Sequence, residues 1–373
     1  MKKSIFAAMI IAAASITSCN NDEETPITPN KGNTGTKETT KETVEDLYAV
    51  KLPKTRAFVM NEGSYDNNDA TLMAFDYSND TVCSTQLILK QNGQRIGDTG
   101  MGLTAYDGDL FFSVYGSSYI AKTDGYGLLK NIFKCDEKMG QPRNIAANDN
   151  NIYVTTYGGY VAKFDAESLT LIDTLKVDAN PEQIIVSDGY IYCVSSGWGA
   201  GNTMTKINET RFTVESIYTI ESNPQKIIAD NNGNIYYTHF DASYNQNIYA
   251  FNESDTTSTY IGYGQNIVAN GNTLYIIGST YDENWMQTNI FYSYNSKTKS
   301  VNEQSFIDSE IEEEIKTANI YAFDRNPYNG DLYIATTDYK TSGIIYHFDS
   351  KGKLISKILT GGINPNKIVF LNE

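Results

Sequence analysis

The side chains best suited to acid–base chemistry and metal binding are scarce or evenly scattered in this sequence. Only two histidines occur among 373 residues, His239 and His347, and neither belongs to an HExxH pattern or a Ser-His-Asp arrangement. Glycine-rich phosphate-binding motifs and DxDxDG calcium loops are missing. Acidic residues next to apolar runs lack the pairing that glycoside hydrolysis requires, and we interpret them as a solvated rim; they are Glu62, Asp66, Asp241, Asp282, Glu283 and Asp338. We therefore expect no enzymatic activity and no catalytic cofactor.

Aromatic residues form the most distinctive set of candidate binding residues. They stand in short segments rich in Gly, Ser, Asn and Asp, and Tyr and Trp offer rigid contact area with a polar group attached. The candidates are Tyr65, Tyr115, Tyr157, Trp198, Phe240, Tyr244, Tyr281, Trp285 and Tyr339, with Tyr119 in the same segment as Tyr115. Together they predict a wide, shallow, aromatic-rimmed surface for a large, partly apolar ligand. Packing between neighbouring loops is the alternative interpretation.

A second candidate set follows a recurring motif in which Asn or Gln precedes Pro. Its copies begin at Gln141, Asn180, Asn223 and Asn364, and Tyr263-Gly264-Gln265-Asn266 is a version without proline. Because Pro fixes φ where the chain begins a strand, we expect the residue two places later near the mouth of a central channel. These residues are Asn144, Gln183, Lys226, Asn266 and Lys367. Alternatively, they only satisfy turn backbone groups or contact solvent.

A repeated sequence pattern predicts the β-strands that must position these residues. A short apolar run is followed by a turn of Asn, Asp and Gly, and then by Ile or Leu next to an aromatic residue. Such turns between apolar runs are a strong signal for β-hairpins, because two-residue hairpin turns need positive φ. The copies are Leu103–Phe111, Ile145–Tyr153, Ile184–Tyr192, Ile227–Tyr236, Ile267–Tyr275 and one ending at Tyr333.

A seventh copy of the pattern is split between the two ends of the chain. Phe58 lies in a second strand that has no first strand before it, whereas Ile368-Val369-Phe370 is a first strand with nothing after it. Seven units over residues 52–373 leave about 46 residues each, enough for four short strands. We therefore predict an all-β fold: a seven-bladed β-propeller of four-stranded blades, closed by pairing of the N- and C-terminal strands. A sandwich or a β-helix fits less well, and a short helix is expected only near 308–316.

The first residues predict export and attachment to a membrane. Residues 1–18 have two lysines and a short apolar run, as in a signal peptide. Ile16-Thr17-Ser18-Cys19 resembles a bacterial lipobox, so Cys19 is the expected lipidation site. Residues 19–46 are acidic and Thr-rich and read as a flexible tether, with an acidic start that resembles the surface-export signal of Bacteroidetes lipoproteins. Residues 47–373 then form the propeller.

The net charge and the number of cysteines limit the possible partners and disulfides. The net charge of −16 disfavours nucleic acid and anionic lipid surfaces as partners. Apart from Cys19, the three cysteines Cys83, Cys135 and Cys193 allow at most one disulfide. We assign them no chemistry.

The chain resembles the YncE-like propeller lipoproteins of gut Bacteroidetes over residues 55–373. The resemblance rests on the lipobox, the tether, the Asn-Pro motifs and three further segments: Val59–Ser64, Ala70–Asp76 and Gly97–Gly100. Within that group it points to the surface cobalamin-binding propellers of the BtuG family. The resemblance implies capture of cobalamin or another corrinoid outside the cell, and transfer to a TonB-dependent outer-membrane transporter. It implies a lipid-anchored, surface-exposed location at the outer membrane. Surface glycan binding and protein scaffolding remain alternatives.

Overall fold

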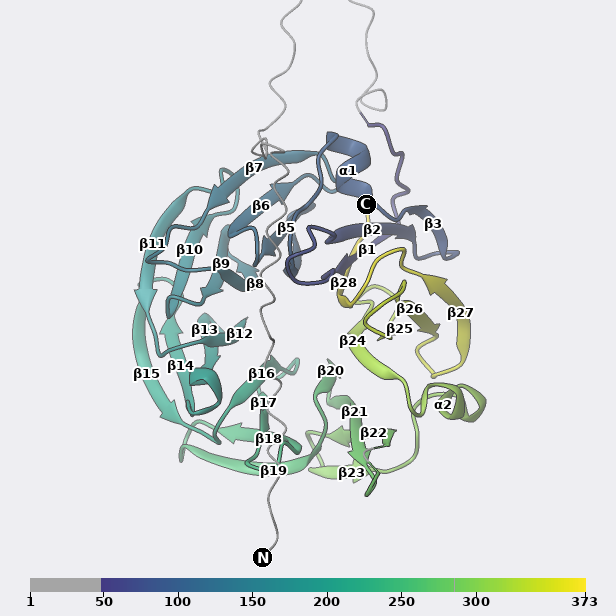
Figure 1. Ribbon diagram of the computed structural model, residues 1–373. Coiled ribbons are helices and arrows are strands. Elements are labelled where there is room, and N and C mark those ends of the chain that lie inside the picture. Colours follow the sequence, from purple (N-terminus) through teal and green to yellow (C-terminus); the bar gives the residue numbers. More distant parts are fainter. Residues whose placement is uncertain (1–47, 285) are drawn as a thin grey trace, which may run out of the picture.

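The computed structural model describes residues 48–284 and 286–373. The predicted signal peptide, Cys19 and the whole of the predicted tether lie outside the described residues. The described chain forms seven four-stranded antiparallel sheets, which Figure 1 shows as blades arranged in a ring. The predicted seven-bladed β-propeller is therefore confirmed.

Within each blade the strands run in order from the central channel outward. The innermost strands are β28 (Pro365–Leu371), β4 (Gly100–Tyr106), β8 (Pro142–Asn148), β12 (Pro181–Ser187), β16 (Pro224–Ala229), β20 (Asn266–Asn270) and β24 (Asn319–Arg325), of blades 1 to 7 respectively. The second strands are β1 (Arg56–Asn61), β5 (Asp109–Val114), β9 (Asn151–Thr156), β13 (Tyr190–Ser195), β17 (Ile235–Phe240), β21 (Thr273–Tyr281) and β25 (Leu332–Thr337).

The two outer layers complete each blade in the same order. The third strands are β2 (Thr71–Asp76), β6 (Tyr119–Thr123), β10 (Tyr160–Asp165), β14 (Thr203–Asn208), β18 (Gln246–Asn252), β22 (Gln287–Asn295) and β26 (Ile344–Phe348). The outermost strands are β3 (Thr81–Ser84), β7 (Leu129–Lys134), β11 (Leu171–Lys176), β15 (Thr213–Thr219), β19 (Thr257–Tyr263), β23 (Ser300–Asn302) and β27 (Leu354–Leu359).

The hairpins between innermost and second strands have the turns that their sequences predict. Asp107 and Gly108 have φ of 48° and 80°, and Asp188 and Gly189 have φ of 50° and 77°. Positive φ at both central residues gives the turn twist that matches two antiparallel strands. Local turn chemistry therefore sets the register of these two hairpins.

The ring closes through the split seventh copy, as predicted. β1 pairs with β28 in antiparallel register, with Phe58 opposite Val369, and the two lie side by side in Figure 1. Beside this seam, Arg56 is fully buried and forms a 2.5 Å salt bridge with Glu373. Its guanidinium carbon lies 4.2 Å from the centre of the Tyr126 ring. The closing strand is thus fixed by side chains as well as by the backbone ladder.

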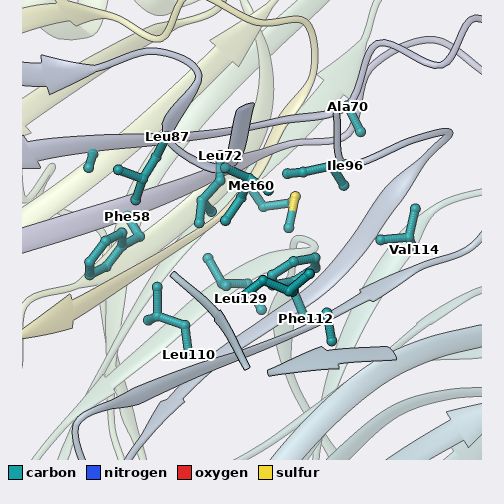
Figure 2. Close-up of a cluster of buried hydrophobic side chains, with 14 of the residues drawn as sticks. Phe58, Met60, Ala70, Leu72, Leu87, Ile96, Leu110, Phe112, Val114 and Leu129 are labelled. Carbon is teal, nitrogen blue, oxygen red and sulfur yellow. The ribbon is translucent and has the colours of Figure 1, made fainter. Parts of the chain in front are cut away.

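Hydrophobic clusters fill the wedges between neighbouring blades. Figure 2 shows the cluster between blades 1 and 2, where Phe58 and Leu72 face Leu110 and Phe112. Leu87 of the short helix α1 (Leu87–Asn92) joins this cluster, and the sequence pattern did not predict that helix. The second helix, α2 (Ser309–Ile315), falls where a helix was expected.

Two further observations concern the described residues as a whole. Cys83, Cys135 and Cys193 are all free thiols. No helix in the described part of the chain is long and apolar enough to cross a membrane.

Candidate functional site

A central cavity of about 620 Å³ runs along the axis of the ring and is lined by residues from all seven innermost strands. Four of the five predicted polar residues line it: Asn144, Gln183, Lys226 and Lys367. The fifth, Asn266, is buried beside it and accepts a hydrogen bond from Lys226 Nζ at 2.9 Å. The polar side chains predicted from the Asn-Pro motifs therefore surround one channel.

The innermost strands begin with a β-bulge, which the sequence pattern did not reveal. Six of the seven carry a register shift in their first residues, all except β20. A bulge sets two residues opposite one and turns an additional side chain inward. Consequently the residue directly after Pro also lines the channel, as Arg143, Glu182, Gln225 and Asn366 do.

Hydroxyl groups on the second strands stabilise three of these bulges. Ser113 Oγ accepts a hydrogen bond from the backbone N–H of Gly102 at 2.8 Å. Thr155 and Thr238 accept the N–H groups of Asn144 and Lys226 in the same way, at 3.1 and 3.2 Å. Buried backbone N–H groups must find such a partner, so a Ser or Thr at this position is a sequence signal that could have located the bulges.

Arg143 lies at the channel mouth and pairs with a buried carboxylate. Glu182 is only 4% exposed, and its Oε2 lies 2.5 Å from Arg143 Nη2. Glu182 Oε1 also accepts hydrogen bonds from Asn180 Nδ2 and Ser196 Oγ, at 2.9 and 2.7 Å. Burial raises the pKa of Glu182 above its ordinary value, against the lowering influence of Arg143. Arg143 therefore neutralises a carboxylate that is otherwise costly to bury.

The interpretation of the acidic residues as a solvated rim is wrong for Glu62, which is hydrogen-bonded within the fold. Its Oε2 accepts hydrogen bonds from the Tyr321 hydroxyl at 2.7 Å and from Asn366 Nδ2 at 3.4 Å. Burial raises its pKa above the ordinary value. By contrast, Asp66, Asp282, Glu283 and Asp338 are exposed, as expected, and Asp241 is partly exposed. Glu62 is thus part of the packed channel mouth.

Four of the predicted aromatic residues form a continuous arc on the face that carries the loops between second and third strands, here called the loop face. The ring centres of Tyr65 and Tyr115 lie 6.3 Å apart. The distance is 5.1 Å from Tyr115 to Tyr157, and again 5.1 Å from Tyr157 to Trp198. One residue comes from each of blades 1 to 4, so this aromatic arc borders one side of the channel mouth.

The remaining aromatic candidates are dispersed over blades 5 to 7. Phe240 ends β17 and lines the channel, and Tyr281 ends β21. Tyr339 packs edge-on against Tyr321, with ring centres 6.0 Å apart, whereas Tyr244 is highly exposed. Trp285 lies outside the described residues.

Tyr119 does not belong to the loop set. It begins β6, is 4% exposed, and donates a 2.5 Å hydrogen bond from its hydroxyl to the carbonyl of Ile96. Its spacing from Tyr115 suggested a loop position, but the loop is short and the strand begins at Tyr119 itself. It is a core residue.

Three of the exposed aromatics adopt a left-handed backbone conformation. Trp198, Tyr244 and Tyr339 have φ of 60°, 62° and 63°, with 71%, 81% and 53% of their surfaces exposed. This conformation costs about 1–2 kcal/mol for a residue with a Cβ. Because these large rings are exposed to water and their backbone is strained, they do not serve stability, and a role in contacts with another molecule is favoured.

Both histidines are engaged in contacts within the fold. His239 is buried, and its Nδ1 lies 2.9 Å from the carbonyl oxygen of Ser222. His347 lies in β26 and bridges two carboxylates: its Nδ1 is 2.8 Å from Asp80 Oδ2, and its Nε2 is 3.2 Å from Asp331 Oδ2. Because Asp80 belongs to blade 1, His347 links blade 7 to blade 1. Within the described residues, no group of three or more His, Cys, Asp or Glu side chains could hold a metal ion.

No known family model matches the sequence, and no curated protein is detectably similar to it. The fold, however, is similar to that of solved seven-bladed propellers. A putative 6-phosphogluconolactonase from Bacteroides fragilis has a TM-score of 0.61 and 13% identity, covering 89% of this chain and all of its own. A putative 6-phosphogluconolactonase from Bacteroides uniformis has a TM-score of 0.60 and 14% identity, with 86% and 100% covered. Kuenenia stuttgartiensis hydrazine synthase has a TM-score of 0.59 and 14% identity, with 74% and 95% covered.

These similarities establish the architecture. They carry no information on activity, because a fold of this kind serves many functions. In this chain the loop face carries an aromatic arc next to a polar mouth.

Proposed function

We propose that this chain is a non-catalytic surface lipoprotein that captures cobalamin or another corrinoid on its loop face. It then passes the ligand to a TonB-dependent outer-membrane transporter. The observation that carries the proposal is the aromatic arc from Tyr65 to Trp198 beside a channel mouth lined with amides. This arrangement complements a broad macrocycle with apolar faces and an amide-bearing rim.

The polar side chains of the channel mouth supply the second half of this complementarity. Gln183, Gln225 and Asn366 offer both hydrogen-bond donors and acceptors, as recognition of primary amides requires. A corrinoid carries a single phosphate, so a protein with a net charge of −16 can bind it without large repulsion. The putative lactonases of similar fold share too little sequence with this chain to lend it an activity.

The location at the cell surface is part of the same proposal and rests on Cys19. In a strain that produces Cys19→Ala, the protein should no longer be retained at the outer membrane. On intact cells the wild-type chain should be cleaved by added protease and labelled by antibody. Retention of the variant at the membrane would contradict lipidation at this residue.

Calorimetric titration with cyanocobalamin tests ligand capture on residues 20–373. We expect one-to-one binding that weakens at least tenfold when Trp198→Ala or Tyr115→Ala interrupts the aromatic arc. Tyr260→Ala is the matched control, because Tyr260 is also an exposed ring but lies on the outermost strand β19. In a Trp285→Phe background, quenching of the remaining tryptophan places the corrinoid near Trp198.

The possible failures of this titration have different meanings. Absence of corrinoid binding would overturn the proposed ligand. Surface glycans would then be the next ligands to test, because aromatic rings also stack on sugars. Binding that is insensitive to both arc variants would overturn the proposed site.

A further inference from the structure

Four polar side chains from consecutive blades form two bonded pairs at the wall of the channel. Lys226 of blade 5 donates from Nζ to Asn266 of blade 6 at 2.9 Å. Lys367 of blade 1 forms a salt bridge with Asp324 of blade 7. This group of Lys226, Asn266, Asp324 and Lys367 lies on the side of the channel opposite the middle of the aromatic arc.

The channel wall is cationic in an otherwise acidic protein. Its lining residues include four with positive side chains and two with negative ones: Arg143, Lys226, Arg325 and Lys367 against Glu182 and Asp324. A cleft lined mainly by one sign of charge, with walls of low dielectric constant, concentrates its field on a ligand of opposite charge.

Among these four residues, two ammonium groups share one carboxylate. Asp324 already accepts Lys367 Nζ through one oxygen and the backbone N–H of Ile368 through the other, the latter at 2.8 Å. Lys226 is bonded to a neutral amide. Burial and the neighbouring charge of Lys367 lower the pKa of Lys226 to about 8, and Asp324 only partly opposes them. The group therefore carries an excess positive charge that a bound anion would relieve.

We propose that the channel holds a binding site for a phosphate-type anion between Lys226 and Lys367. Lysine ammonium groups bind phosphate oxygens as point charges, and the cavity of about 620 Å³ has room for such a group. The anion has two possible sources: a free phosphate, or the phosphodiester of a corrinoid side arm that enters the channel from its mouth. The second source rests on the function proposed above.

Titration of residues 20–373 with inorganic phosphate tests the site without any corrinoid. We expect saturable binding, weakened at least tenfold in Lys226→Met. Lys340→Met is the matched control, since Lys340 is an exposed cation on a loop of the loop face, and it should bind phosphate like wild type. Because Lys367→Met alone leaves Asp324 buried and unpaired, the double variant Lys367→Met/Asp324→Asn serves in its place and should also bind weakly. No saturable binding, or equal binding by Lys226→Met, would overturn the site.

Cobalamin and cobinamide distinguish the two sources, because cobinamide lacks the phosphodiester arm. If the arm occupies the site, Lys226→Met weakens cobalamin binding but not cobinamide binding, and phosphate competes with cobalamin. If a free anion occupies it, phosphate and cobalamin bind together and the variant affects neither corrinoid. Should neither corrinoid bind while phosphate does, the corrinoid function fails and the anion site stands.

Discussion

Arg143 donates a 2.6 Å hydrogen bond from Nη1 to the hydroxyl of Tyr157, and its guanidinium carbon lies 4.9 Å from the centre of the same ring. The same side chain neutralises Glu182 inside the channel mouth. One arginine thus connects the aromatic arc to the buried polar groups, and it holds Tyr157, the third ring of the arc, in place. Position and orientation of the arc therefore depend on a residue that needs no contact with ligand.

Replacing Arg143 alone should destabilise the protein more than replacing Arg143 and Glu182 together. Arg143→Met leaves Glu182 buried without its cation, which costs about 3–5 kcal/mol of unfolding free energy. Glu182→Gln combined with Arg143→Met should recover most of this loss, because no uncompensated charge remains. Urea unfolding measures both. Equal stability of the single and double variants would show that the pair is not coupled.

Glu62 should make stability fall as pH rises from acid toward neutral. Because burial raises its pKa above 4.5, the native state binds this proton more tightly than the unfolded state does. The resulting stabilisation is complete below pH 4.5 and is lost as pH rises through the raised pKa. Glu62→Gln should therefore be more stable than wild type near pH 8 and nearly equal to it near pH 4, by urea unfolding at both values. Asp66→Asn, at an exposed carboxylate nearby, is the control, and a gain of the same size there would contradict the assignment to burial.

Tyr244→Gly should raise stability, although it removes a large side chain. The backbone at Tyr244 has φ of 62°, and glycine adopts this conformation without the strain of about 1–2 kcal/mol. The greater freedom of glycine in the unfolded chain offsets about 0.5–1 kcal/mol, so a net gain of about 0.5–1 kcal/mol is expected. Thermal unfolding measures it. The control Tyr260→Gly, within strand β19, should lower the melting temperature, and a lower melting temperature for Tyr244→Gly would contradict the strain argument.

Lys226 should make the protein gain stability in mildly alkaline solution. Its pKa is about 8 in the folded protein against an ordinary 10.5, so between these values the unfolded state binds more protons and folding becomes more favourable as pH rises. Lys226→Met should lack this gain, and the stability difference between variant and wild type should narrow from pH 7 to pH 10. Urea unfolding across that range measures it. A constant difference would mean that Lys226 titrates normally.

Much of the fold could be predicted from the sequence because local chemistry specifies it. Asp-Gly and Asn-Gly turns fix the hairpins, and the split copy around Phe58 and Ile368 fixes the closure of the ring. The channel positions of Lys226 and Lys367 followed from their distance to the preceding proline. These are short-range signals, and each has one structural solution.

The parts that sequence reasoning missed depend on departures from regular strand geometry or on distant contacts. A strand of period two sends only one of Arg143 and Asn144 inward, and only the bulge brings both to the channel. Burial of Glu62 depends on Tyr321 and Asn366, which are more than 250 residues away. The connection of four aromatic loops into one arc likewise depends on the ring geometry.

The closure of blade 1 also governs when the protein can finish folding. β28 begins about 300 residues after β1 ends, which at ribosomal rates of about 5–20 residues per second is roughly 15–60 s of synthesis. Throughout that time β1, whose residues are all buried in the finished ring, has one edge without its partner. Any product of interrupted translation that stops before Pro365 keeps this apolar edge open. Because an unpaired strand edge is a template for pairing with other chains, such truncated products should be prone to aggregation.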